Sequence, residues 1–149
     1  MAAATYDIRQ FIDGLNQPQH TRRVEMKWVG LDFSKRGTPG LSANQNADIG
    51  TIKKGFVYEG STVIIRTPEG QTATMNLGTD VTANAFLAAG NINGAANTAV
   101  AKTGAEVAAG TYFDVDTPVR VTCPNAANTI DVAVLDIFIW GFMAKSSTG

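Results

Sequence analysis

The sequence predicts an all-β sandwich with an extended amino-terminal arm. The first reason is that apolar and polar residues alternate with the period of half-buried strands at 24–33, 62–67, 71–77, 119–123 and 129–142. The second reason is that the Ala-rich stretch at 83–109 does not hold a helical pattern, because glycines and asparagines interrupt it and no apolar stripe lasts three turns. The chain has 149 residues, enough for one domain with a real core. We assign the arm to 1–23 and the sandwich to 24–149.

The arm at 1–23 is polar and mixed, with Gly14 and Pro18 as breakers. Its short apolar cluster consists of Ile8, Phe11, Ile12 and Leu15. Spacings of three and four residues fit one or two helical turns, or an arm that docks on a partner.

The first strand is predicted at 24–33 because apolar residues occupy both of its faces. One face carries Val24, Met26 and Trp28, and the other carries Val29, Leu31 and Phe33. The change of face near Trp28 predicts a bulge or a strand covered on both sides.

A loop is predicted at 35–48, where Gly, Pro, Ser and Asn recur and apolar periodicity is lost. Strand patterns resume at 49–58 and 62–67, and we predict a tight turn between them at 59–61. The residues TPEG at 67–70 place Pro and Gly as a type I turn requires.

The strand at 71–77 is predicted to be half-buried and to end at Gly78. One face carries Thr72, Thr74 and Asn76, and the other carries Ala73, Met75 and Leu77. After it we expect a short turn or helical piece at 86–88, and brief strands near 99–102.

Two strands at 119–123 and 129–142 are predicted to close the domain, with 124–128 as their connection. The last is the most hydrophobic segment, and its apolar side chains occupy both faces, so we expect it to be central or pressed against another subunit. The candidate oligomer contacts are Leu135, Ile137, Ile139, Trp140 and Phe142.

The composition narrows the classes of partner. There are 12 Lys and Arg against 13 Asp and Glu, so no global basic charge indicates nucleic acid. Charged residues make up only 17%, which predicts that partners cover some of the surface. No segment approaches the roughly 20 apolar residues of a membrane span, and we expect no membrane contact. One local basic cluster consists of His20, Arg22, Arg23, Lys27, Lys35 and Arg36.

No residue pattern predicts catalysis, a metal or a cofactor. His20 is the only histidine, and its place in the polar segment QPQHTRR favours a lone surface histidine over a catalytic base. Cys123 is the only cysteine, which excludes an intrachain disulfide. Because a free cysteine usually behaves as a small apolar residue, we predict that Cys123 is buried. Asp114 and Asp116 share a face but lack the oxygen ligands of a calcium loop, so we interpret them as a turn.

Two tryptophans leave a second interpretation open. Trp28 and Trp140 could line a sugar site, but both lie in strongly apolar strands, so we predict that they pack in the core.

Longer motifs give the sequence a resemblance to a known group. These are EGQTATMNLG, then ANAFLAAGNINGAANTAV, and later AAGTYFDVDTPVRVTCPNAANTIDVAVLDIFIWGF. In these segments, from 50 to 142, the chain resembles small structural proteins of tailed bacteriophages. The resemblance implies a jelly-roll-like antiparallel β sandwich that decorates or cements the capsid, commonly as a homo-oligomer, and carries over no catalytic residues. The region at 1–48 has no counterpart in that group.

Together these observations predict a capsid decoration protein, made in the host cytoplasm, that bridges neighbouring subunits of the major capsid protein on the virion surface. The alternative is a receptor- or glycan-binding domain of a head fibre or tail. We expect a homotrimer, with a dimer as the alternative. The candidate capsid contacts are the apolar Phe11, Ile12 and Leu15 and the basic Arg22, Arg23, Lys35 and Arg36.

Overall fold

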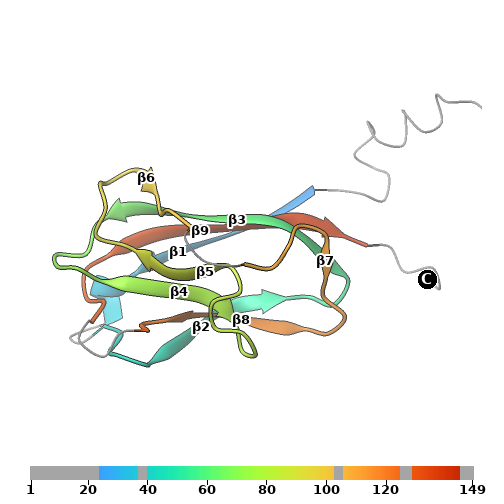
Figure 1. Cartoon of the computed structure of the whole chain (residues 1–149), viewed down its shortest axis with the longest axis horizontal. Helices are drawn as coiled ribbons and strands as arrows, with labels where there is room; N and C mark the ends of the chain where they lie inside the picture. Colours follow the sequence, from blue (N-terminus) through green and yellow to red (C-terminus); the bar gives the residue numbers. More distant parts are fainter. Residues whose placement is uncertain (1–23, 37–39, 103–105, 125–128, 145–149) are drawn as a thin grey trace, which may run out of the picture.

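The computed structural model describes residues 24–36, 40–102, 106–124 and 129–144, apart from the side chains of Val24 and Arg36. Within these residues the chain forms two antiparallel sheets that pack against each other (Figure 1). The predicted all-β sandwich is confirmed. The arm assigned to 1–23 lies outside the described residues.

The two sheets contain all the named strands. The first has the order β1-β9-β3-β6, and β7 also pairs with β3. Its strands are β1 (Val24–Asp32), β3 (Phe56–Thr67), β6 (Thr98–Ala99), β7 (Thr111–Tyr112) and β9 (Val134–Met143). The second has the order β2-β8-β4-β5. Its strands are β2 (Asn46–Ile52), β4 (Thr74–Thr79), β5 (Leu87–Asn91) and β8 (Thr117–Thr122).

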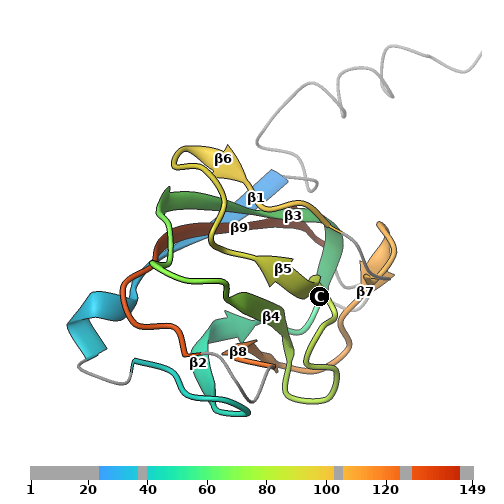
Figure 2. The ribbon, with the colours of Figure 1, turned by 60° about the vertical axis from the view of Figure 1, so that its left-hand side comes forward.

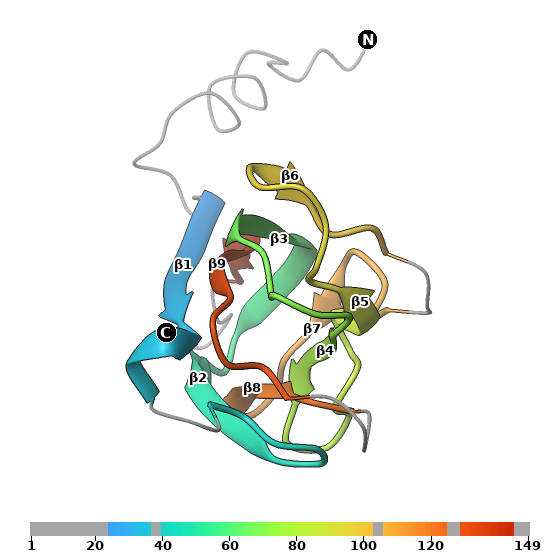
Figure 3. The ribbon, with the colours of Figure 1, turned by 90° about the vertical axis from the view of Figure 1, so that its left-hand side faces the viewer.

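The strands pair in a nested way. The first, β1, pairs with the last, β9, while β2 pairs with β8, β3 with β6, and β4 with β5. The chain therefore resembles one long hairpin rolled up so that successive pairs fall alternately in the two sheets (Figure 2). This wiring brings β1 and β2 to the same side of the sandwich, where each is the end strand of its sheet (Figure 3).

The core lies between the two sheets and is built by alternation. Along 73–77 the predicted faces are confirmed, because Ala73, Met75 and Leu77 are buried while Thr74 and Asn76 between them are only partly buried. Aromatic rings fill the middle of the core, and Tyr58 stacks on Phe86 with ring centroids 5.1 Å apart. Cys123 is buried, as expected of a small apolar residue.

The predicted turn at 59–61 is wrong. β3 continues through these residues, and the chain reverses earlier, at 53–55, where Gly55 has a φ of +98° that suits glycine. The pairing of β3 with β9 shifts register between Tyr58 and Gly60. Gly60 therefore marks an irregularity inside a strand.

The first strand forms as predicted, as β1, but neither explanation offered for its two apolar faces is right. β1 pairs with β9 in one unbroken register, so it contains no bulge. Nor is it covered on both sides, because Met26 and Trp28 are exposed in the part of the chain that the structure describes.

Three other boundaries differ from the sequence-based prediction. The expected loop at 35–48 begins with the end of the 3-10 helix η1 (Phe33–Arg36) and includes the start of β2, and its Leu41 is buried and bridged to Ile130. The expected turn at 86–88 contains the start of β5, and the closing strand begins at Val134. The brief strand expected near 99–102 is β6. In each case long-range pairing sets the boundary.

A buried carboxylate fixes the approach to β9. Glu69 is only 3% exposed, and its Oε2 accepts hydrogen bonds from the backbone N–H groups of Asp131, Val132 and Ala133 at 3.0, 3.0 and 3.1 Å.

Among the described residues no helix is long and apolar enough to cross a membrane.

Candidate interaction surface

The side of the first sheet that faces away from the core is apolar. In an antiparallel pair, residues directly opposite each other point to the same side of the sheet. Phe138 and Trp140 of β9 alternate with buried core residues, so they point outward, and Trp28 and Met26 of β1 lie opposite them. We define the outer apolar face by Met26, Trp28, Val57, Ile64, Tyr112, Phe138, Trp140 and Phe142.

Several large side chains of this face are solvent-exposed. Met26 is 61% exposed, Trp28 is 60% exposed and Tyr112 is 52% exposed. Single exposed apolar residues are ordinary, but a contiguous group that crosses neighbouring strands marks an interaction surface. The face therefore offers a contact area for a partner.

Charged groups border the outer apolar face at one end. Asp136 of β9 points to the same side and forms an ion pair with Arg66, whose guanidinium also donates to Asn97 Oδ1 at 3.3 Å. Arg66 and Asp136 neutralise each other at this end of the sheet, and the rest of the outer apolar face carries apolar side chains.

The predicted oligomer contacts divide between the two sides of β9. Leu135, Ile137 and Ile139 lie in the core between the sheets. Trp140 and Phe142 are half-buried and belong to the outer apolar face. Only these two are placed where another molecule can contact their side chains.

The predicted capsid contacts are mostly beyond the described residues. Phe11, Ile12, Leu15, Arg22 and Arg23 all lie there. Lys35 is exposed on η1, and Arg36 ends that helix.

The prediction that both tryptophans pack in the core is wrong. Trp28 is exposed and Trp140 is half-buried, both on the outer apolar face. Alternation identified which residues share a face, but it did not show which face lacks a cover. The sequence therefore did not identify Met26 and Tyr112 as surface residues. The alternation that places Met26 and Trp28 on the same side of β1 is the sequence signal that could have identified part of the outer apolar face.

An open groove separates the end strands β1 and β2. It has a volume of about 230 Å³, and its walls include Val29 and Leu31 from β1 and Ala47 and Ile49 from β2. A smaller hollow continues it between Lys27, Val29 and Ile49. Lys27 points toward this side of the sheet and lies 3.7 Å from Glu25, measured from Nζ to Oε1.

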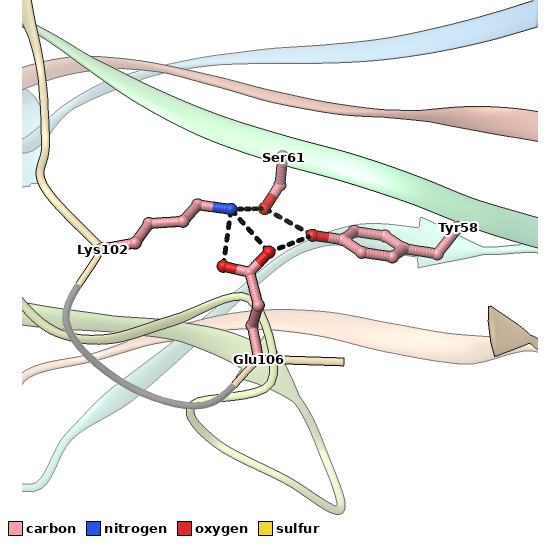
Figure 4. A network of polar contacts seen from close by, with 4 residues as sticks. All are labelled: Tyr58, Ser61, Lys102 and Glu106. Atoms are coloured by element: carbon pink, nitrogen blue, oxygen red, sulfur yellow. Dashed lines mark hydrogen bonds and ion pairs between the residues drawn. The ribbon is translucent and has the colours of Figure 1, made fainter. Parts of the chain in front are cut away.

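A polar network closes another part of the sandwich (Figure 4). Lys102 Nζ lies 2.8 Å from Glu106 Oε2 and donates to Ser61 Oγ at 2.9 Å. The Tyr58 hydroxyl lies 3.0 Å from Ser61 Oγ and donates to Glu106 Oε1 at 3.2 Å. Every member has a partner, and the network joins 102 and 106 to β3.

The network has the residue types of a serine–lysine site, but its arrangement favours a structural role. Ser61 is only 5% exposed, and Lys102 is engaged in an ion pair with Glu106. Burial raises the pKa of Tyr58 to about 12, which keeps its hydroxyl protonated. We therefore interpret the network as a structural link that joins residues 102 and 106 to β3.

The paired aspartates lie at the reversal before β8. Asp116 Oδ1 accepts a hydrogen bond from the backbone N–H of Lys54 at 2.9 Å, and this bond together with the nearby Lys53 lowers the pKa of Asp116. The residues that the structure describes contain no cluster of three or more metal-ligating side chains.

Comparison with known proteins adds a structural relation. No protein-family model matches the chain, and no curated protein matches it. A chain of the cyanophage Pam1 capsid asymmetric unit has a similar fold. The two chains are 17% identical and superpose with a TM-score of 0.57, over 83% of this chain and 86% of that one.

This similarity establishes a shared sandwich fold. It extends over most of both chains. At 17% identity the relation concerns the arrangement of strands.

Proposed function

We propose that the protein is a virion structural protein that decorates and cements a tailed-phage capsid by bridging neighbouring coat subunits. The observation that carries this proposal is the near full-length similarity in fold to a chain of a phage capsid asymmetric unit. The nested strand pairing supports a jelly roll, an architecture used by many viral capsid domains. The site of action is the capsid surface, and the partner is the major capsid protein.

The outer apolar face supports self-association. Trp140 and Phe142 would contact another copy, with Trp28 and Met26 beside them. Repeated copies on a symmetric shell strengthen weak individual contacts through avidity. We propose a homotrimer, with a dimer as the alternative.

The arm would supply contacts to coat subunits. Phe11, Ile12 and Leu15 are its apolar anchors. The basic residues Arg22, Arg23, Lys35 and Arg36 would pair with acidic groups of the coat protein, and exposed pairs of this kind weaken as salt rises.

The test is binding of purified protein to bare capsids. A Phe11→Ser, Leu15→Ser double variant should occupy fewer sites than wild type at equal concentration, because its apolar anchors are removed. Gln19→Ser, a polar change in the same arm, is the matched control and should bind as wild type does. Undiminished occupancy by the double variant would show that these residues are not the cementing contacts.

One observation favours a second function. Trp28 and Tyr112 expose aromatic rings on one face, as glycan-binding surfaces do. A soluble glycan that quenches the fluorescence of Trp28, and loses this effect in Trp28→Ser, would support a receptor- or glycan-binding head-fibre or tail domain instead.

A further inference from the structure

β1 ends the first sheet with a long and regular edge. It has nine residues in one unbroken register with β9, and no strand of the described residues pairs with its other side. The other end strands are short or irregular, because β6 and β7 have two residues each, β2 contains a register shift and β5 has a positive φ at Ala89. A long, regular edge readily accepts a further strand.

The hydrogen-bonding pattern shows which residues of β1 present their backbone at this edge. The N–H of Phe33 donates to the carbonyl of Ala133 at 3.0 Å, which continues the register of β1 and β9 by one residue. In an antiparallel pair, hydrogen-bonded and non-hydrogen-bonded residues alternate along the strand. The odd-numbered residues of β1 therefore bond to β9, and Met26 and Trp28 direct their N–H and C=O groups to the free edge.

The groove side of β1 carries two opposite charges. Glu25 and Lys27 lie on the same side of the strand, 3.7 Å apart from Oε1 to Nζ, and their side chains are 36% and 37% exposed. Charges on an end strand usually discourage pairing with another strand. Here the two signs lie symmetrically about Met26, so a copy of the strand that runs in the opposite direction presents the complementary charge to each.

A second copy of β1 satisfies both charges in one register. When two copies pair antiparallel about a two-fold axis at Met26, Glu25 of each copy lies opposite Lys27 of the other. Cross-strand pairs of opposite sign stabilise a sheet. Because Met26 directs its backbone to the edge, the two Met26 residues form a hydrogen-bonded pair. The charged residues then occupy non-hydrogen-bonded pairs, in which the side chains lie closer together.

Other two-fold registers do not satisfy the charges. An axis at Glu25 places two glutamates opposite each other, and an axis at Lys27 does the same for two lysines; like charges directly opposite each other destabilise a sheet. An axis at Trp28 places Lys27 opposite Val29 and gives neither charge a charged partner across the strands. Axes nearer either end of β1 carry Glu25 past the end of the other strand. An axis between two residues would place side chains from different faces opposite each other.

We propose that two copies of the protein associate by antiparallel pairing of their β1 strands about a two-fold axis at Met26. The paired segment is 24–28 in each copy, which is a usual length for a strand. The first sheets of the two copies then form one continuous sheet, and their outer apolar faces become one surface. This contact accounts for the dimer that is the alternative to a homotrimer. It concerns the free protein and does not depend on the capsid role.

Charge reversal tests the register. Lys27→Glu should weaken dimerisation at least about ten-fold, because it places glutamates opposite each other at two equivalent points. Glu25→Lys should have a similar effect by placing lysines opposite each other. The matched control is Lys53→Glu, which makes the same change in net charge at an exposed ion pair with Asp116. Sedimentation velocity over a range of concentrations measures dimerisation, and circular dichroism checks that each variant is folded.

A mixture of the two single variants provides the sharpest result. In a mixed pair, the two lysines of the Glu25→Lys chain lie opposite the two glutamates of the Lys27→Glu chain, so both cross-strand pairs again have opposite signs. We expect each variant alone to be mainly monomeric and the equimolar mixture to form dimers. Monomers in the mixture, or undiminished dimers of either variant alone, would contradict the register. A wild type that forms only monomers or only trimers would overturn the proposal.

A cysteine at the axis provides a test that does not use charge. In Met26→Cys the two equivalent Cα atoms would be about 5.5 Å apart, within the range of a disulfide. Tyr112→Cys, which is also exposed on the outer apolar face but lies on β7, is the matched control. Mild oxidation of dilute protein, followed by non-reducing electrophoresis, should give a covalent dimer for Met26→Cys alone. Equal cross-linking of both variants, or of neither, would contradict an axis at Met26.

Discussion

The indole of Trp140 lies directly over Gly60. A Cβ atom built on Gly60 would come within 2.4 Å of the ring. Trp140 belongs to β9 and Gly60 to the neighbouring β3, at the point where their pairing shifts register. The absence of a side chain at 60 lets the ring lie close to the sheet and shapes the middle of the outer apolar face.

Gly60→Ala should therefore destabilise the fold by about 1–3 kcal/mol, the usual cost of forcing an extra methyl group into a packed site. Urea unfolding measures the change. Gly70→Ala is the control, because a Cβ at Gly70 meets nothing within 4 Å. Equal stability of the Gly60 and Gly70 variants would show that the ring moves aside freely.

Gly60 also illustrates what the sequence could not indicate. Beside Glu59 and Ser61 it has the composition of a turn, but its role depends on a tryptophan 80 residues away. The faces of β4 were predictable because burial there follows local alternation. The exposure of Trp28 was not, because alternation assigns residues to faces without showing which face the protein itself covers.

Glu69→Gln should destabilise the fold by about 1–3 kcal/mol. One oxygen of the Glu69 carboxylate accepts hydrogen bonds from three backbone N–H groups. The neutral amide of glutamine would accept these hydrogen bonds more weakly, and its NH2 group would add donors to a buried site. Differential scanning calorimetry measures the effect. Glu59→Gln, at an exposed position of β3, should change little.

The polar network predicts a titration at high pH. The pKa of Tyr58 is raised from 10.0 to about 12, so the folded state holds this proton more tightly than the unfolded state. The resulting stability is fully present below pH 10 and is lost as pH rises through 12. The difference in ultraviolet absorbance between wild type and Tyr58→Phe should show a tyrosinate transition near pH 12. A transition at pH 10 would contradict the burial of this hydroxyl.

The outer apolar face predicts a selective loss of self-association. Trp28→Ser should leave unfolding stability within about 1 kcal/mol, since the side chain is already 60% exposed, and it should weaken association at least ten-fold, as expected when an interface tryptophan is removed. Sedimentation velocity measures the association. Val81→Ser, an exposed apolar residue outside this face, is the control. An unchanged oligomer in the Trp28 variant would assign assembly to another surface.

The copy number of the protein in purified virions tests the proposed capsid role most directly. Quantitative mass spectrometry against the major capsid protein gives this number. We predict hundreds of copies per particle in a fixed ratio to the coat protein, because a decoration protein repeats with the symmetry of the shell. A few copies per particle would instead indicate a tail or head-fibre component and contradict the proposal.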